Sequence, residues 1–194
     1  NKVTSLPDNT KSIISGTKIL RVGGSVYDFY MPEWAGVNPE NGLPQWYLAD
    51  KDGNNTGEKT SKYSDAGSFV AGSSLPNLVG GVQNSFTYKN FDLNVNMIFT
   101  YGNNAGRAWS KEILSHWTPE NTQTNVPKLT TDATNWTSAS TRFLYSGTYA
   151  RIKNVSFGYS LPGALLKRIN IDKIRVFATA ENLLTFYGHK GMDP

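Results

Sequence analysis

Two neighbouring stretches of the chain alternate apolar and polar residues. In Phe91–Tyr101 every second residue is apolar and the first residues between them are Asp and Asn, and residues 79–88 follow a similar pattern. A strand points successive side chains to opposite faces, so each stretch is expected to form a strand with one apolar and one polar face. Only Lys89 and Asn90 separate the two stretches. The region 79–101 therefore predicts a β-hairpin with a tight turn.

A second pair of strands is expected near the C-terminal end. Residues 148–161 alternate apolar residues with small polar ones until Pro162 interrupts the pattern, and residues 173–187 alternate again. The segment between these two stretches is compact. The region 148–187 therefore predicts two strands joined by a short connection.

The remaining chain is irregular. Residues 1–78 and 102–147 are crowded with Gly, Pro, Asn and Asp, which are turn signals, and a short helix is expected at 107–117. Residues 188–194 begin a further connection. The strands are thus joined by short connections at one end and long ones at the other. Outer-membrane barrels show this asymmetry, with short periplasmic turns and long extracellular loops.

The apolar face of these strands must contact either a protein core or lipid. The opposite face carries mostly Asn, Ser, Gly, Thr and Gln, whereas the outer face of a soluble sandwich usually carries Lys and Glu. This composition favours a hydrated lumen on the polar side and lipid on the other. The residues expected to face lipid are Phe91, Leu93, Val95, Met97, Phe99, Val155, Phe157 and Tyr159.

Composition narrows the classes of function. Charged residues make up 18% and aromatic residues 12% of the 194 residues, which is low in charge and rich in rings for a soluble domain. The net charge of +4 comes from scattered basic residues, so no basic stripe indicates nucleic-acid binding. The sequence has no cysteine, which excludes disulfides and Cys-based zinc sites. No apolar run reaches the roughly 18 residues of a spanning helix, whereas a spanning strand needs only about 9–11.

Four strings in the chain carry a family resemblance. They are FYMPEWAGVNPENGLPQWY, PNLVGGVQNSFTYKNFDLNV, SKEILSHWTPENTQTNVPKL and YARIKNVSFGYSLPGALLKRINIDKIRVFATAENLLTF, in this order. Together they resemble the C-terminal part of the SusC/RagA-like TonB-dependent transporters of Bacteroidetes outer membranes. The resemblance covers nearly the whole chain, and the last string is its most specific part.

The resemblance implies a fold and a function. The fold would be all-β: an antiparallel transmembrane β-barrel of about 22 strands whose lumen is plugged, with long extracellular loops. This chain would supply about four of the strands as a fragment of a longer polypeptide, whose N-terminal part would contact the TonB complex. A SusD-like surface lipoprotein would cover the extracellular mouth. The transporter would import a glycan or an oligopeptide across the bacterial outer membrane, without a cofactor and without acting as an enzyme.

Aromatic residues in the expected loops are candidates for contact with the substrate or with the lid. Flat rings can stack on sugar rings and on peptide side chains. The alternative is that these rings hold the long loops together as a folded cap. The candidates are Trp34, Trp46, Tyr47, Trp109, Trp117 and Trp136.

The sequence gives little evidence for a metal site or a catalytic site. Residues 50–55 are rich in Asp and Asn, but they lack the Gly and Glu positions of a calcium-binding EF-hand loop. Glu112 and His116 lie four residues apart without a third metal ligand. No nucleophile elbow, zinc-protease motif or phosphate-binding loop occurs in the sequence.

A soluble, secreted β-sandwich that binds carbohydrate is the alternative hypothesis. It predicts that the apolar strand faces pack against a second sheet and that the protein folds without detergent. A β-rich glycoside hydrolase is a third hypothesis, and it predicts that one carboxylate substitution abolishes turnover. The sequence offers no positive signal for this enzyme.

Overall fold

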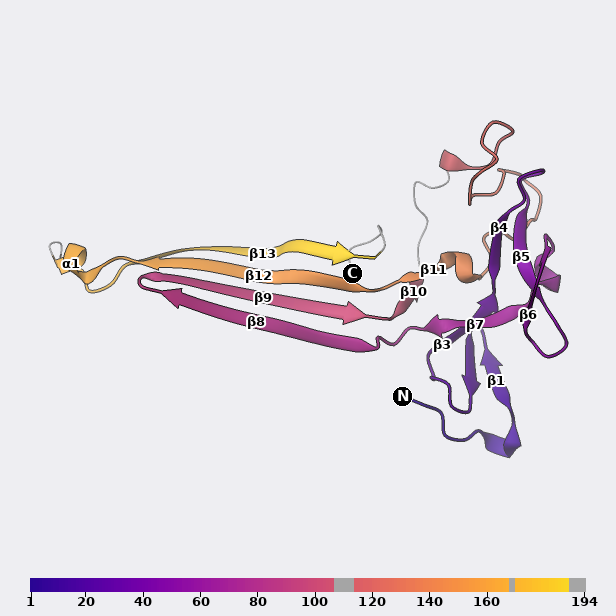
Figure 1. The fold of residues 1–194 in the computed structure, drawn as a ribbon, viewed down its shortest axis with the longest axis horizontal. Coiled ribbons are helices and arrows are strands. Elements are labelled where there is room, and N and C mark those ends of the chain that lie inside the picture. Colours follow the sequence, from indigo (N-terminus) through magenta and orange to yellow (C-terminus); the bar gives the residue numbers. More distant parts are fainter. Residues whose placement is uncertain (107–113, 168–169, 189–194) are drawn as a thin grey trace. The chain divides into compact units, whose positions relative to one another are not determined.

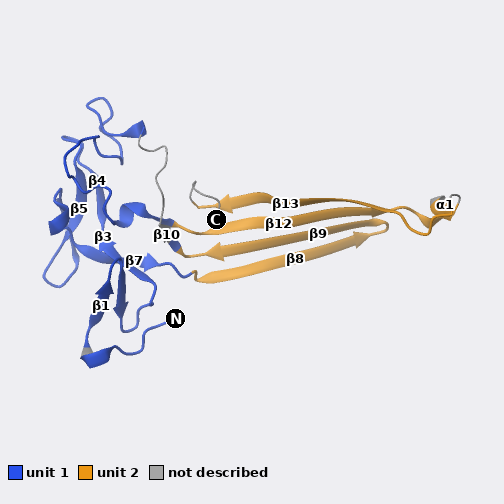
Figure 2. Cartoon of the chain, turned by 180° about the vertical axis from the view of Figure 1, so that it is seen from behind, with its two compact units in different colours: residues 1–75, 104–145 blue, residues 76–103, 146–194 orange. Residues whose placement is uncertain are grey.

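The computed structural model describes residues 1–106, 114–167 and 170–188. The chain folds into two compact units, shown in different colours in Figure 2. Unit 1 comprises residues 1–75 and 104–145, and unit 2 comprises residues 76–103 and 146–194. Most of the helix expected at 107–117 lies outside the described residues.

Unit 2 is a four-stranded antiparallel sheet with the strand order β13-β12-β9-β8 (Figure 1). Its strands are β8 (Leu78–Tyr88), β9 (Phe91–Tyr101), β12 (Tyr149–Ser160) and β13 (Arg175–Tyr187). They lie on the four alternating stretches of the sequence. Each has enough residues to meet the roughly 9–11 of a membrane-spanning strand.

The connections of this sheet differ between the two ends of its strands. At the short-turn edge, Lys89 and Asn90 join β8 to β9, and the short helix α1 (Gly163–Leu166) lies between β12 and β13. Lys89 adopts a left-handed backbone with φ of 53°, as tight hairpin turns require. At the opposite edge, the first residue of β8 pairs with the last of β9. Both segments of unit 1 join the sheet at this end of the strands. We name this end of the sheet, which includes Leu78 and Tyr101, the long-connection edge.

One face of the sheet, here called the apolar face, gathers the alternating apolar residues. The register places all eight expected lipid-facing residues on it together, and the Phe91 ring packs against Phe157 and Tyr159 at 5.8 and 4.6 Å between centroids. Strand by strand, its members are Leu78, Gly80, Val82, Asn84, Phe86 and Tyr88; Phe91, Leu93, Val95, Met97, Phe99 and Tyr101; Ala150, Ile152, Val155, Phe157 and Tyr159; Val176, Ala178, Ala180, Leu184 and Phe186.

The register of β12 changes at one residue. Asn154 pairs with Asn96 of β9 and the next pair joins Ile152 to Met97, so Lys153 is an extra residue on β12. An extra residue of this kind forms a β-bulge, which shifts the alternation of the side chains beyond it.

The bulge determines which β12 side chains reach which face. With strict alternation from Val155, Arg151 would lie on the apolar face. With the bulge, Arg151 lies on the opposite, polar face, where it is only 8% exposed and its Nε donates to Oγ1 of Thr185 at 3.1 Å. The bulge therefore keeps a cation away from the apolar face, where an unpaired charge would be costly.

The polar face carries an ion pair that reaches across three strands. Nε of Arg175 on β13 donates to Oδ1 of Asp92 on β9 at 3.0 Å. Between them, β12 presents Gly158, where a Cβ atom would lie 2.5 Å from Oδ1 of Asp92. Because glycine has no side chain, the two charged groups can meet over the middle strand.

Unit 1 consists of short strands in small antiparallel sheets. A four-stranded sheet in the order β1-β2-β3-β7 and a three-stranded sheet in the order β4-β5-β6 make up most of it, and β10 pairs with β11. The strands are β1 (Ser12–Ser15), β2 (Lys18–Arg21), β3 (Asp28–Pro32), β4 (Trp34–Val37), β5 (Pro44–Ala49), β6 (Asn55–Thr60), β7 (Ser68–Ser73), β10 (Asn104–Gly106) and β11 (Leu144–Ser146). Single 3₁₀ turns lie at Pro7–Asn9, Tyr63–Asp65 and Thr141–Phe143.

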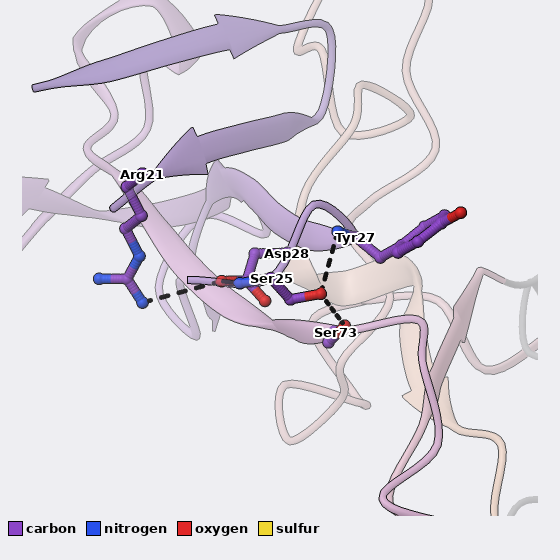
Figure 3. Close-up of polar contacts among 5 residues, drawn as sticks. All are labelled: Arg21, Ser25, Tyr27, Asp28 and Ser73. Atoms are coloured by element: carbon purple, nitrogen blue, oxygen red, sulfur yellow. Dashed lines mark hydrogen bonds and ion pairs between the residues drawn. The ribbon is translucent and has the colours of Figure 1, made fainter. Parts of the chain in front are cut away.

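A buried carboxylate fixes the connection between β2 and β3 (Figure 3). Oδ2 of Asp28 accepts a hydrogen bond from the backbone N–H of Ser25 at 3.0 Å and lies 3.9 Å from the guanidinium of Arg21. Oγ of Ser25 accepts from the N–H of Tyr27 at 3.1 Å and from Oγ of Ser73 on β7 at 3.4 Å. Hydrogen bonds thus hold the residues of the connection to one another and to β7.

We expect Asp28→Ala to loosen this connection by about 1 kcal/mol, because the substitution leaves the partly buried Ser25 N–H without its acceptor. Limited proteolysis of the membrane-inserted receptor should then cut within residues 22–27 faster than in the wild type. Asp28→Asn is the matched control, since its amide oxygen still accepts the bond. Equal cleavage of all three proteins would show that the carboxylate does not hold the connection.

Among the residues that the structure describes, no helix is both long and apolar enough to cross a membrane.

Candidate substrate-facing and lipid-facing surfaces

Trp46 forms the core of unit 1. Its side chain on β5 has no exposed surface, and its ring meets those of Trp34 and Tyr63 edge to face at 5.7 and 5.2 Å. The hydroxyl of Tyr63 in turn donates to the carbonyl of Ala139 at 2.6 Å. The Trp46 ring is thus enclosed by other parts of unit 1.

Two further candidates share one cation. The guanidinium of Arg142 lies 5.0 Å from the ring centroids of both Trp34 and Trp136, a distance at which cation–π attraction is substantial. Nε1 of Trp34 also donates to Oδ1 of Asn125 at 2.6 Å. Contacts inside unit 1 therefore cover part of the surface of both tryptophans.

Trp117 and Tyr47 are half-buried at other places in unit 1. Nε1 of Trp117 donates to the carbonyl of Pro39 at 3.1 Å, and its ring packs closely over Gly42. The ammonium of Lys59 lies 5.8 Å from the Tyr47 ring centroid. Trp109 lies outside the described residues. The five described aromatic candidates thus belong to several small clusters and do not form one continuous platform.

Gly42→Ala is expected to destabilise the turn before β5 by about 2 kcal/mol. Gly42 has a φ of 72°, a left-handed conformation that is strained for alanine, and a Cβ atom there would lie 2.6 Å from Cδ2 of Trp117. Gly53→Ala is the matched control: its φ is 83° but the added Cβ meets nothing within 4 Å, so only about 1 kcal/mol of strain is expected.

Hydrogen exchange of the two turns in the intact receptor measures this difference. Protection should fall more around Gly42 than around Gly53 when each is replaced by alanine. Equal losses would mean that the contact with Trp117 adds nothing to the strain of the backbone.

A cavity of about 380 Å³ lies in unit 2 at the long-connection edge. A second cavity, of about 320 Å³, lies within unit 1, and Glu33 is one of its lining residues. Oε2 of Glu33 accepts a hydrogen bond from Nδ2 of Asn55 at 2.9 Å. None of the residues around this second cavity was a candidate from the sequence, because they come from scattered short strands and from the turns and connections beside them. The unit 1 cavity is lined by Glu33, Phe69, Val70, Ala71, Asn104, Thr141 and Leu144.

The acidic stretch at residues 50–55 is a turn. Oδ1 of Asp50 accepts from the backbone N–H groups of Asn54 and Asp52 at 2.8 and 2.9 Å. The hydrogen bonds from Asn54 hold the pKa of the Asp50 carboxyl below its ordinary value. Among the described residues no three His, Cys, Asp or Glu side chains gather as metal ligands, and Glu112 is not among those residues.

Known proteins resemble the chain over its whole length. No protein-family model matches it. The TonB-dependent receptor P3 of Formosa agariphila is 31% identical over 228 aligned residues, which include 100% of this chain and 22% of the receptor. The TonB-dependent receptor P26 of the same organism is 28% identical and matches 64% of this chain. The chain thus spans about a fifth of the first of these relatives.

Solved structures give the same result for the fold. The structure of the RagAB peptide transporter superposes with a TM-score of 0.78 and 27% identity over 99% of this chain, which is 23% of that chain. The RagAB peptide importer in its open-open state gives a TM-score of 0.76 and 25% identity. The similarity covers residues of both units, so the short strands of unit 1 as well as the sheet of unit 2 have counterparts in a known transporter.

Proposed function

Because this chain is a segment of a SusC/RagA-like TonB-dependent transporter, we propose that the complete protein imports a glycan or an oligopeptide across the bacterial outer membrane. Its fold is part of an antiparallel transmembrane β-barrel, which the chain alone does not close. One observation carries the proposal: the four strands of unit 2 form an amphipathic sheet whose long connections all leave from one edge.

The two faces of this sheet support different environments. Large apolar side chains remain exposed on the apolar face, including Phe86 at 59%, Phe157 at 48% and Val176 at 62%. The polar face presents the Asp92–Arg175 ion pair and amide side chains, together with a smaller number of exposed apolar side chains such as Val79 and Phe177. In a transmembrane barrel the apolar face meets lipid and the polar face meets the lumen. The residues expected to face lipid are therefore proposed to do so.

Unit 1 is proposed to belong to the extracellular vestibule and to the surface on which a SusD-like lipoprotein lies. Its connection to the sheet only at the long-connection edge supports this placement, since long loops of outer-membrane barrels are extracellular. The similar solved structures are of a complex named RagAB, described as a peptide transporter. Substrate would be captured between the lid and these loops and moved inward without chemical change, powered through TonB.

The first test is the intact mass of the native polypeptide, isolated from membranes of the cells that produce it. A mass several times the 21.4 kDa of this chain supports a complete barrel with a plug. A water-soluble protein with a mass near 21.4 kDa would overturn the proposal, because four strands cannot close a barrel and would leave open edges in lipid.

Uptake measurements separate the substrate classes. Cells carrying the complete receptor should accumulate either labelled oligopeptides or labelled oligosaccharides, and uptake should stop when TonB is removed. Uptake that persists without TonB would contradict the proposed mechanism. Cells without the receptor gene are the control for passive entry through porins.

A further inference from the structure

The apolar face is not evenly packed: it contains a groove at the long-connection edge. The register places Ala150 of β12 between Phe99 of β9 and Phe186 of β13. A small residue between two large rings leaves a hollow above the middle strand. The cavity of about 380 Å³ in unit 2 lies here, and Phe99, Ala150, Phe186 and Tyr101 are among its lining residues.

The position of the Phe99 ring keeps this groove open. A Cβ atom at Gly80, on the far side of β9, would lie 2.6 Å from Cζ of Phe99. The ring therefore extends over Gly80 toward β8, and it leaves the space above Ala150 free. On the other side, Phe186 stands 59% exposed as the second wall.

The ends of the groove differ. Toward the middle of the sheet, the next residue of β12 on the apolar face is Ile152, which pairs with Met97 and lies outside the lining of the groove. Toward the long-connection edge the groove ends among Tyr101, Thr148 and Gly188. Oγ1 of Thr148 accepts from the N–H of Gly102 at 3.1 Å, and its carbonyl accepts from the N–H of Gly188 at 3.1 Å. Both oxygens of Thr148 at this end are thus hydrogen-bonded within unit 2.

We propose that this groove between Phe99 and Phe186 binds a single acyl chain of a membrane phospholipid. The inference rests on the proposed membrane function, which makes the apolar face the lipid-facing surface. The groove is continuous with that surface, and apolar groups line most of it. It also lies over β12, which has a strand on each side, so further strands added beyond β13 would leave the groove open.

The chemistry of the groove fits an acyl chain better than a headgroup. The cavity lies within the range of about 300–1,000 Å³ that is usual for ligand sites. None of its lining residues is charged, so a phosphate or an ammonium group would find no counter-ion there. An acyl chain enters with favourable apolar burial and needs no polar partner.

Native mass spectrometry of the delipidated complete receptor, titrated with palmitoyl-oleoyl phosphatidylethanolamine, tests the proposal. The wild type should retain one lipid more tightly than the rest. Ala150→Trp fills the groove and should weaken that binding about tenfold. Ala178→Trp is the matched control, because it adds the same bulk to the apolar face outside the groove. Ala178 lies on β13 opposite Phe157, and its substitution should leave the binding unchanged.

A second variant separates loss of the groove from misfolding caused by the added tryptophan. Phe186→Ala removes one wall without adding bulk and should also weaken binding of the tight lipid. Glycerophosphoethanolamine, which has the headgroup without chains, should not compete. Equal lipid retention by the wild type, Ala150→Trp and Phe186→Ala would overturn the groove site, even if the receptor assembles and imports normally. Failure of the wild type to assemble in membranes would instead overturn the proposed function.

Discussion

Val95→Arg is expected to prevent assembly of the barrel in the outer membrane. Val95 lies near the middle of β9 on the apolar face, where it pairs with Val155 of β12 and Asn84 of β8. An arginine at the midplane of the lipid face of such a barrel costs about 2–4 kcal/mol. That cost is a large part of the stability of a typical folded protein. The amount of heat-modifiable, compactly migrating receptor in the outer-membrane fraction is the measurement.

Asn96→Arg is the matched control for this substitution. Asn96 is the next residue of β9 and lies on the polar face, between Gln83 and Asn154. A hydrated lumen accepts a new cation at far lower cost, so assembly should be nearly normal. If Val95→Arg assembles as well as Asn96→Arg, the apolar face does not contact lipid, and a soluble β-sandwich becomes the better interpretation.

The strands of unit 2 could be predicted from the sequence because their alternation is strong and local. A period of two over the 11 residues of Phe91–Tyr101 matches a strand, whereas in a helix Leu93, Met97 and Tyr101 would lie away from the other apolar residues. The all-β prediction and the family resemblance are both confirmed by the similarity to TonB-dependent receptors and to RagAB. The register between strands could not be read locally, because pairing depends on residues far apart in the chain.

The apolar face also contains residues that the pattern did not indicate. Asn84 and Gly80 stand on it among the large apolar side chains of β8. Gly80 makes room for the ring of Phe99 across the strand pair, a reason that appears only when the register is known. The groove above Ala150 has the same origin, since three residues from separate strands create it.

The aromatic candidates in unit 1 show a different limit of sequence reasoning. Composition identifies a tryptophan in a turn-rich segment but not what its ring contacts. The structure encloses Trp46 completely and sets Arg142 beside Trp34 and Trp136. Long loops need a core of their own, and in short strands with few aliphatic residues the large rings supply it. Contact of the half-buried rings with a substrate or lid remains a prediction.

The β12 bulge leads to the second large effect: deleting Ser156 should abolish barrel assembly, whereas deleting Lys153 should be tolerated. Ser156 is regularly paired with Asn94 and Thr179. Its removal moves every β12 residue before it to the opposite face of the sheet. Arg151, which pairs with Ile98 near the end of β9, would then reach the lipid face, where the cost of a cation depends on depth, and apolar side chains would turn toward the lumen.

Lys153 behaves differently because it is an extra residue relative to β9, although β13 has two residues, Asn182 and Leu183, opposite it. Without Lys153, Ile152 directly precedes Asn154 in the chain. Strict alternation then puts Ile152 on the apolar face and Arg151 on the polar face, as in the wild type. Both deletions shorten β12 by one residue, so each controls for the length of the other. The measurement is again compact receptor in the outer membrane. Loss of assembly in both deletions would mean that the bulge serves the shape of the barrel and not only the facing of Arg151.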